Sequence, residues 1–191
     1  MKRFTQLASA LAAAFVLGAC SSAPKSSPIV NNAPEWVNKG TGAFKDQAGK
    51  QVFYGVGIVS GVRNVSLAVP AADDKGRVEL ARIMNSMADS LSKNYAASVG
   101  SGDKASEEQM ISQTSKVLSS FTLHGSVPVD HYVDRSDKDH PVYYALVKLD
   151  MAAVQDGLAQ SKELDTKVRD YVKANAEKAF DELSAEQAKH Q

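Results

Sequence analysis

The sequence predicts an α+β fold, in which a small antiparallel sheet of about three strands carries helices on one face. Residues 51–60, 121–135 and 142–150 either mix aromatic with β-branched residues or alternate apolar with polar ones, which is typical of strands. Residues 73–97 and the chain after 150 repeat apolar residues every three or four positions, which is typical of helices. The two later strands follow each other directly, so we expect them to form an antiparallel hairpin.

The composition limits the class of protein. The chain has 191 residues, of which 43% are hydrophobic and 23% charged, and its 22 Lys and Arg balance its 22 Asp and Glu. This length suits one domain with appendages, and a net charge of zero creates no basic field that would attract nucleic acid. Cys20 is the only cysteine, which excludes an internal disulfide, and no Cys/His spacing predicts structural zinc.

Residues 1–19 are predicted to be a signal peptide. A short positive start precedes an uncharged, alanine-rich run over residues 7–17, which is shorter than the about 20 residues that a membrane-spanning helix needs. The run ends in the motif LGAC (17–20), which resembles a lipobox, the pattern read by the lipoprotein-processing pathway. The resemblance implies cleavage between Ala19 and Cys20 and diacylation of the cysteine thiol. The alternative is a free cysteine buried in an ordinary signal peptide.

Under the lipobox interpretation Cys20 becomes the first residue of the mature chain and its membrane anchor. Several acyl chains hold a protein on a membrane durably, whereas a single chain binds marginally. Ser21 stands where an aspartate often marks inner-membrane retention in enteric lipoproteins, so the resemblance favours the outer membrane and leaves periplasmic or surface orientation open. The lipidated cysteine opens a segment, 20–34, whose serines, prolines and asparagines predict a flexible tether.

A folded α+β domain is predicted over residues 35–160. Trp36, the only tryptophan, is interpreted as an anchor that packs the N-terminal edge onto the core, and the alternative is a contact with a partner. Tyr54 is the second candidate for a partner contact. Residues 38–50 are rich in Gly, Lys, Thr and Asp and are predicted to be a loop.

The strand predicted over 51–60 carries Gly55 and Gly57 on one face, which indicates that another part of the chain packs closely over that face. A long helix is predicted next, with Asp73 or Asp74 as its cap. Its apolar stripe, in which the methionines are interpreted as core filler, consists of Leu80, Ile83, Met84, Met87, Leu91 and Tyr95.

A second helix is predicted to begin at a capping box formed by Ser106 and Gln109. An extended segment over residues 107–118 is the alternative. In the strand that follows, Pro128 has no amide hydrogen to donate to a neighbouring strand, so it is expected at a sheet edge or a bulge. The final strand, 142–150, carries the strongest strand pattern in the chain.

The chain after the last strand is predicted to be helical. Asp150 is expected to cap a helix that begins at Met151, and residues 161–191 form a long charged helix. Asn175 interrupts the apolar stripe of this helix, which favours a surface helix docked on its own domain over a coiled coil or a free partner-binding helix. The stripe consists of Leu164, Val168, Tyr171 or Val172, Ala179 and Leu183.

Several acidic residues and two histidines surround the predicted hairpin turn. A divalent-cation site is one interpretation, but a solvated turn with side chains that cap backbone groups is favoured. For His131, packing beside the core is a further alternative. The residues concerned are Asp130, His131, Asp134, Asp137, Asp139 and His140. Because the chain also lacks a GxSxG motif and a GxGxxG motif, we predict no catalytic residue, metal, cofactor or small-molecule substrate.

Four short motifs resemble the twenty-kilodalton bacterial lipoprotein family first known from Helicobacter. They are PEWV (34–37), FYGVG (53–57), RVELAR (77–82) and YYALVKL (143–149). The resemblance covers about residues 34–155, and the sequence departs from the family pattern at 64–70 and after 162. It implies a compact α+β domain without enzymatic activity. Members include outer-membrane antigens and the flagellar outer-membrane lipoprotein, which forms a ring around the motor and is needed for motility.

The sequence and this resemblance together predict a non-enzymatic outer-membrane lipoprotein with a structural or assembly role in the cell envelope. Its expected partners are the membrane, through the lipid on Cys20, and either further copies of itself or another envelope protein. A role in the flagellar outer-membrane ring is the narrower form of this hypothesis. The alternative is a monomeric, periplasm-facing adapter that binds an envelope or cell-wall partner.

Overall fold

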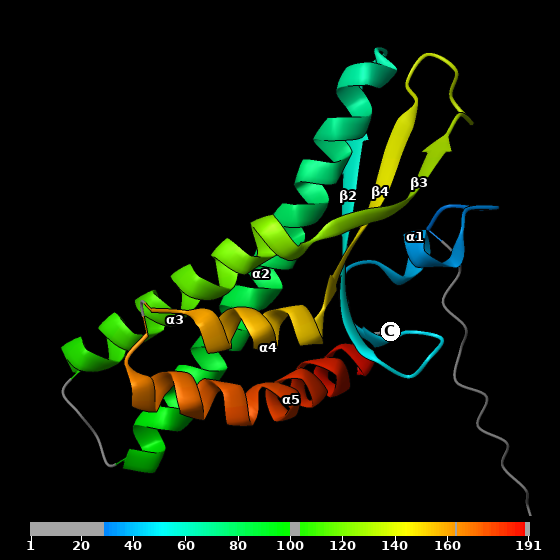
Figure 1. Ribbon diagram of the computed structural model, residues 1–191. Coiled ribbons are helices and arrows are strands. Elements are labelled where there is room, and N and C mark those ends of the chain that lie inside the picture. The colour runs from blue at the N-terminus through cyan, green and yellow to red at the C-terminus, as the bar shows by residue number, and fades with distance from the viewer. Residues whose placement is uncertain (1–28, 100–103, 163, 190–191) are drawn as a thin grey trace, which may run out of the picture.

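A computed structural model describes residues 29–99, 104–162 and 164–189 and has the predicted α+β fold (Figure 1). In this view α2 runs along one face of the sheet, α1 lies on the opposite side, and α3, α4 and α5 gather around the lower half of α2. In chain order the elements are α1 (Glu35–Lys39), β1 (Gly42–Lys45), β2 (Gln51–Ser60), α2 (Val65–Val99), α3 (Lys104–Gly125), β3 (Val127–Asp134), β4 (Val142–Asp150), α4 (Met151–Gln160) and α5 (Thr166–Ala188).

The sheet has four strands in the order β1-β2-β4-β3, and all neighbours are antiparallel. The bounds of β2 and β4 agree with the predicted strands, and β3 and β4 form the predicted hairpin. Pro128 lies on the edge strand β3, and the register shifts between Pro128 and Asp130. The proline therefore occupies both of the settings that its missing amide hydrogen requires, an edge and a bulge.

The first strand, β1, was not predicted, because its sequence GAFK lies inside the segment expected to be a loop. Tertiary contacts form it: β1 pairs with the start of β2, and the amide of Ala43 donates to Oε1 of Gln187, 2.9 Å away on α5. The turn between the strands depends on Asp46, whose carboxylate accepts from the amides of Ala48 and Lys50, both at 2.9 Å. The sheet therefore has four strands, one more than the about three that the sequence predicted.

The long helix α2 begins at Val65, well before the two aspartates predicted to cap it. The cap is Asn64, whose Oδ1 accepts from the amide of Ser66 at 3.0 Å. Pro70 lies inside the helix, where it removes one backbone hydrogen bond. Burial offsets this loss, since the alanines on either side of Pro70, Ala68 and Ala72, are fully buried in a cluster with residues of β2 and β4.

The second long helix, α3, is helical over residues 107–118, which confirms the helix over the extended alternative. It continues to Gly125, so prediction of a strand from residue 121 was wrong for its first residues. In this last part of the helix Thr122 is fully buried, and its hydroxyl donates to the carbonyl of Leu118, one turn earlier, at 3.0 Å. The prediction that a capping box at Ser106 opens this helix was wrong, because α3 begins at Lys104 and Ser106 lies inside its first turn.

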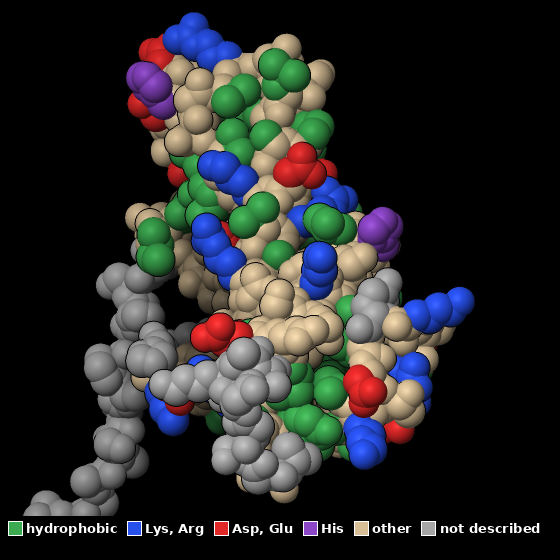
Figure 2. Space-filling model, turned by 90° about the vertical axis from the view of Figure 1, so that its left-hand side faces the viewer, with side chains coloured by type: hydrophobic (Ala, Val, Ile, Leu, Met, Phe, Trp, Pro, Cys, Tyr) green, Lys and Arg blue, Asp and Glu red, His purple; other side chains and the backbone are tan. Residues whose placement is uncertain are grey.

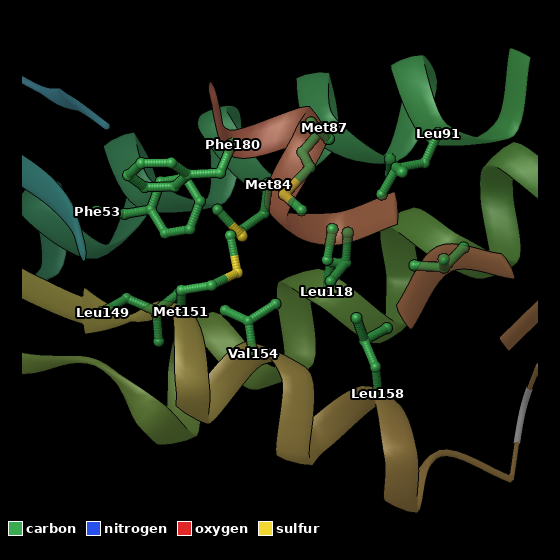
Figure 3. Close-up of a cluster of buried hydrophobic side chains, with 14 of the residues drawn as sticks. Phe53, Met84, Met87, Leu91, Leu118, Leu149, Met151, Val154, Leu158 and Phe180 are labelled. Atoms are coloured by element: carbon green, nitrogen blue, oxygen red, sulfur yellow. The ribbon is translucent and has the colours of Figure 1, made fainter. Parts of the chain in front are cut away.

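The main core lies where the inner face of the sheet meets α2, α3, α4 and α5 (Figure 3). Phe53 of β2 and Phe180 of α5 are fully buried and meet edge to face, with ring centroids 4.9 Å apart. The predicted methionines are core filler, since Met84 and Met87 are also fully buried. The stripe predicted on the first long helix is therefore the face that α2 turns toward this core.

The last two helices are packed onto the same core. α4 begins at Met151 as predicted, but the carboxylate of Asp150 bonds the ammonium of Lys148 at 2.8 Å instead of capping the helix. α5 buries Val172 and Phe180 and docks on its own domain, as favoured over a coiled coil. Asp165 caps α5, because its carboxylate accepts from the amide of Lys167.

Candidate functional site

The outer face of the sheet, opposite α2, carries its own small apolar cluster. Val56 of β2 and Tyr144 and Leu146 of β4 are buried there under Val37 of α1. The short helix α1 and the chain leading into it are therefore the cover of this face. Because the cover is short, the aromatic side chains around it are only partly buried.

Trp36 and Tyr54, the two predicted partner contacts, line the same hollow on this outer face. The hollow measures about 330 Å³ and is lined by Trp36, Phe44, Tyr54 and Leu146, together with four charged residues and two others. We call it the aromatic hollow. The rings of Phe44 and Tyr54 are tilted against each other with centroids 5.9 Å apart. Residues from α1, β1, β2 and β4 thus build one concave, partly apolar surface.

Trp36 anchors α1 to the far edge of the sheet. Its indole Nε1 donates to a carboxylate oxygen of Asp130 on β3 at 2.8 Å, and its ring packs against the outer apolar cluster. The prediction that Trp36 packs the N-terminal edge onto the fold is confirmed. A contact between Trp36 or Tyr54 and a partner stays a prediction.

Local hydrogen bonds fix the position of α1. The side-chain amide of Asn38 bonds both the N–H and the C=O of Val30, at 2.9 and 3.0 Å, which holds the incoming chain against the helix. Lys39 pairs with Glu35 one turn earlier at 2.9 Å. The helix ends at Gly40, whose φ of 74° is in the region that favours glycine. Sequence reasoning singled out Trp36 but missed the role of Asn38.

A second and larger groove, of about 800 Å³, adjoins the aromatic hollow and shares Lys39 and Gly40 with it. It follows the free edge of β2. β1 pairs only with residues 51–54, so residues 55–60 have one strand neighbour, β4, within the described part of the chain. The opposite wall comes from α2 and is formed by Lys75, Val78, Glu79 and Arg82. We call this hollow the edge groove.

Glycines bring α2 close enough to form that wall. A Cβ added to Gly55 would overlap the carbonyl oxygen of Gly76, and one added to Gly57 would overlap the carbonyl oxygen of Ala72. The close packing that the glycines of β2 predicted is therefore confirmed. Its functional consequence, a groove between the strand edge and the helix, was not predicted, because Gly76 on α2 gives no such signal in the sequence.

Side chains satisfy the outward backbone groups of β2 where no strand does. The amide of Val56 donates to the hydroxyl of Thr41 at 2.8 Å, and the ammonium of Lys75 donates to the carbonyl of Ile58 at 2.9 Å. In an antiparallel strand, the N–H and C=O of one residue point to the same side. Both main-chain groups of Val56 and of Ile58 therefore point into the edge groove.

The acidic and histidine residues of the hairpin turn separate into exposed pairs and do not converge. His140 bonds Asp137 at 3.0 Å, and this contact lowers the pKa of the Asp137 carboxyl. Asp139 bonds Arg63 at 3.3 Å. Among the described residues no three His, Cys, Asp or Glu side chains come close enough together to hold a metal ion.

His131 does not pack in the core. Its side chain is exposed, with Nε2 2.7 Å from a carboxylate oxygen of Asp73 on α2. It pairs across the sheet with the fully buried Ala145, so it lies beside the small core cluster and not inside it. Its contact with Asp73 ties the edge strand β3 to the helix behind the sheet.

Two groups on β4 have shifted ionisation. Burial raises the pKa of the Tyr144 hydroxyl, and the negative charge of Asp134 adds to the effect. The hydrogen bond to Asp150 raises the pKa of the Lys148 ammonium. On the face at the left of Figure 1, acidic, basic and hydrophobic side chains are interspersed (Figure 2). The two pKa shifts on β4 thus come from the burial of Tyr144 and from the hydrogen bond between Lys148 and Asp150.

The predicted lipid-attachment and cleavage residues, Cys20 and Ala19, and most of the tether lie outside the described residues. Within the described ranges, no helix combines the length and the apolar character needed to cross a membrane. Comparisons of the chain with protein-family models, with curated proteins and with solved structures found no match. What the molecule itself defines is an α+β domain with an aromatic hollow and an adjoining groove along a free sheet edge.

Proposed function

We propose that the protein is a lipid-anchored lipoprotein of the outer membrane with a structural or assembly role in the cell envelope, and that it is not an enzyme. The observation that carries the proposal is the position of Cys20. The only cysteine of the chain ends an apolar run, follows two small residues and precedes a Ser/Pro-rich segment. A thiol at this point serves as an attachment site for palmitate and other acyl chains.

Metabolic labelling tests the anchor. Cys20→Ala should abolish incorporation of radioactive palmitate, whereas Ser22→Ala, which leaves the LGAC motif intact, should label as the wild type does. Labelled wild-type protein should fractionate with the outer membrane. Persistent labelling of Cys20→Ala, or normal retention of this variant in the membrane fraction, would overturn the proposal that Cys20 carries the lipid anchor.

The aromatic hollow supports an assembly role. Its rings lie on the side of the sheet where the chain arrives from the tether, and two of its charged residues, Lys39 and Glu35, are exposed and form an ion pair. Aromatic side chains at a concave surface are typical of protein-binding sites. The narrower form of the proposal is a component of the flagellar outer-membrane ring. Normal swimming of a deletion strain would remove this narrower form.

A monomeric adapter is the second candidate, and the edge groove favours it. A groove with outward-pointing main-chain groups suits a partner that supplies an extended segment. Sedimentation of the full chain in detergent separates the two candidates. A single species of monomer mass at high concentration would support the adapter, and a closed oligomer would support a ring.

A further inference from the structure

The edge groove has the features of a slot for an added strand. Binding by strand addition needs a free strand edge, main-chain groups that face the ligand, and hollows for alternate side chains. Residues 55–60 of β2 supply the free edge, and Ile58 supplies an N–H and a C=O that both face the groove. The flank of α2 limits the slot on the other side.

Each wall of the slot carries an exposed apolar side chain. Ile58 is 47% exposed and Val78 is 52% exposed, and both line the groove from opposite sides, β2 and α2. An extended chain lying between them presents every second side chain to the same wall. Apolar side chains at the alternate positions that face α2 would therefore cover Val78 and remove it from water, while the positions between them lie beside Ile58.

The charges of the groove favour an acidic ligand. Lys39, Lys75 and Arg82 line it together with Glu79 as its acidic residue. Lys39 pairs with Glu35 and Arg82 pairs with Glu79. Within the described part of the chain, the ammonium of Lys75 contacts a carbonyl oxygen and no carboxylate. Lys75 is thus a cation at the strand edge with no counter-charge of its own.

We infer that the edge groove binds an extended segment of a partner protein, apolar at alternate positions and carrying a carboxylate, by adding it as a strand to β2. The ligand backbone takes over the two main-chain groups of Ile58. Lys75 leaves the carbonyl of Ile58 and pairs with the carboxylate of the ligand. A hydrogen bond to this charged acceptor is stronger than the present one to a neutral carbonyl. The inference names the class of partner for the proposed assembly role and rests on it.

The composition of the tether makes it a poor occupant of the same slot. Residues 21–28 read SSAPKSSP, a sequence that contains a lysine and no acidic residue to match the basic groove. Pro24 and Pro28 also have no amide hydrogen for a neighbouring strand. Ile29, which follows this segment, lines the groove. An acidic segment of a partner nevertheless matches the charge of the groove better than the tether does.

A displayed library of random peptides of about ten residues, selected on the full-length protein in detergent, tests the inference. Enriched peptides should alternate apolar residues and carry Asp, Glu or a free terminal carboxylate. Bound to the isotope-labelled protein, they should shift the amide resonances of Gly57 and Ile58. Amidating the peptide terminus shows whether a terminal or a side-chain carboxylate is read, because only a terminal one is lost.

Matched variants separate the groove from the rest of the surface. Val78→Glu should weaken the selected peptides about tenfold or more, since it places a charge on the apolar wall. Val65→Glu, on the same helix and 49% exposed, should bind like the wild type. Lys75→Glu should weaken binding as strongly as Val78→Glu does, whereas Lys93→Glu, another exposed lysine of α2, should leave it unchanged.

Four outcomes would overturn the inference: no enrichment, equal binding by Val78→Glu and the wild type, tighter peptide binding once residues 21–28 are deleted, or self-association that Val78→Glu abolishes. The third outcome would make the tether the occupant, and the fourth a second copy. None of these results depends on acylation. Palmitate labelling and fractionation therefore fail or succeed separately, and they alone decide the lipid anchor.

Discussion

Gly55 of β2 and Gly76 of α2 meet backbone to backbone, so closely that a methyl group on Gly55 would overlap the carbonyl oxygen of Gly76. This contact sets the distance between the sheet and its longest helix. It also places the flank of α2 beside the free edge of β2, where the edge groove lies. Stability and the shape of the groove thus depend on the same glycines.

Gly55→Ala should therefore destabilise the protein. The added methyl group has backbone on its far side, so the helix must shift, and overpacking of this kind costs about 1–3 kcal/mol. Urea unfolding followed by circular dichroism measures the loss. Ser60→Ala, at the exposed end of the same strand, is the control and should change the free energy of unfolding little. Equal stability of the two variants would contradict the close contact.

Phe180→Ala tests whether α5 belongs to the core. Phe180 is fully buried against Phe53, and removing a buried phenylalanine costs about 3–5 kcal/mol. Thermal unfolding of the full chain should show a large drop in the midpoint. Lys178→Ala, two residues earlier on an exposed position of α5, should unfold close to the wild type. A free charged tail would instead leave both variants equally stable.

The single tryptophan gives a direct readout of its anchor. Asp130→Ala removes the acceptor of the Trp36 indole N–H, so the ring should move into water and its fluorescence emission should shift to longer wavelength. Because the bond is exposed, the loss of stability should be about 1 kcal/mol or less. Asp139→Ala, in the turn beyond the same strand, is the matched control. An unchanged emission spectrum in Asp130→Ala would show that the bond does not hold the ring.

Elements with a strong local pattern were predictable from the sequence, and elements formed by tertiary contacts were not. The bounds of β2 and β4 follow from their dense aromatic and β-branched composition. The glycines of β2 correctly predicted that another part of the chain, α2, packs closely over the strand. β1 forms because α5 and β2 satisfy its backbone groups. α2 begins as early as Val65 because Asn64 caps it and the alanines around Pro70 fit against the sheet. Neither reason is visible in a local window.

The candidate site was predictable only in part for the same reason. Trp36 and Tyr54 were predicted as partner contacts, and the structure brings both into the aromatic hollow. The edge groove depends on where β1 stops pairing with β2, which is a matter of register. Lys75 and Val78 lie on a helix with no unusual local signal, so only the fold assigns them to the groove.

Stability should fall in alkaline solution, because two groups on β4 hold their protons more tightly in the folded state. Burial raises the pKa of Tyr144 above its ordinary value of 10.0, and the bond to Asp150 raises the pKa of Lys148 above 10.5. Above these values the unfolded chain releases protons that the folded chain still binds, so the free energy of unfolding decreases as pH rises. The stability linked to both protons is fully present below pH 10.0 and is lost as pH rises through the folded pKa values.

Urea unfolding at about pH 8 and about pH 11 measures this loss for each protein separately, so that effects of the substitutions on packing cancel. Tyr144→Phe keeps the ring and removes the ionising hydroxyl, and Lys148→Met keeps most of the chain and removes the charge. Each variant should lose less stability between the two pH values than the wild type does, and the double variant should lose least. The same alkaline loss in all four proteins would show that these two protons are not its source.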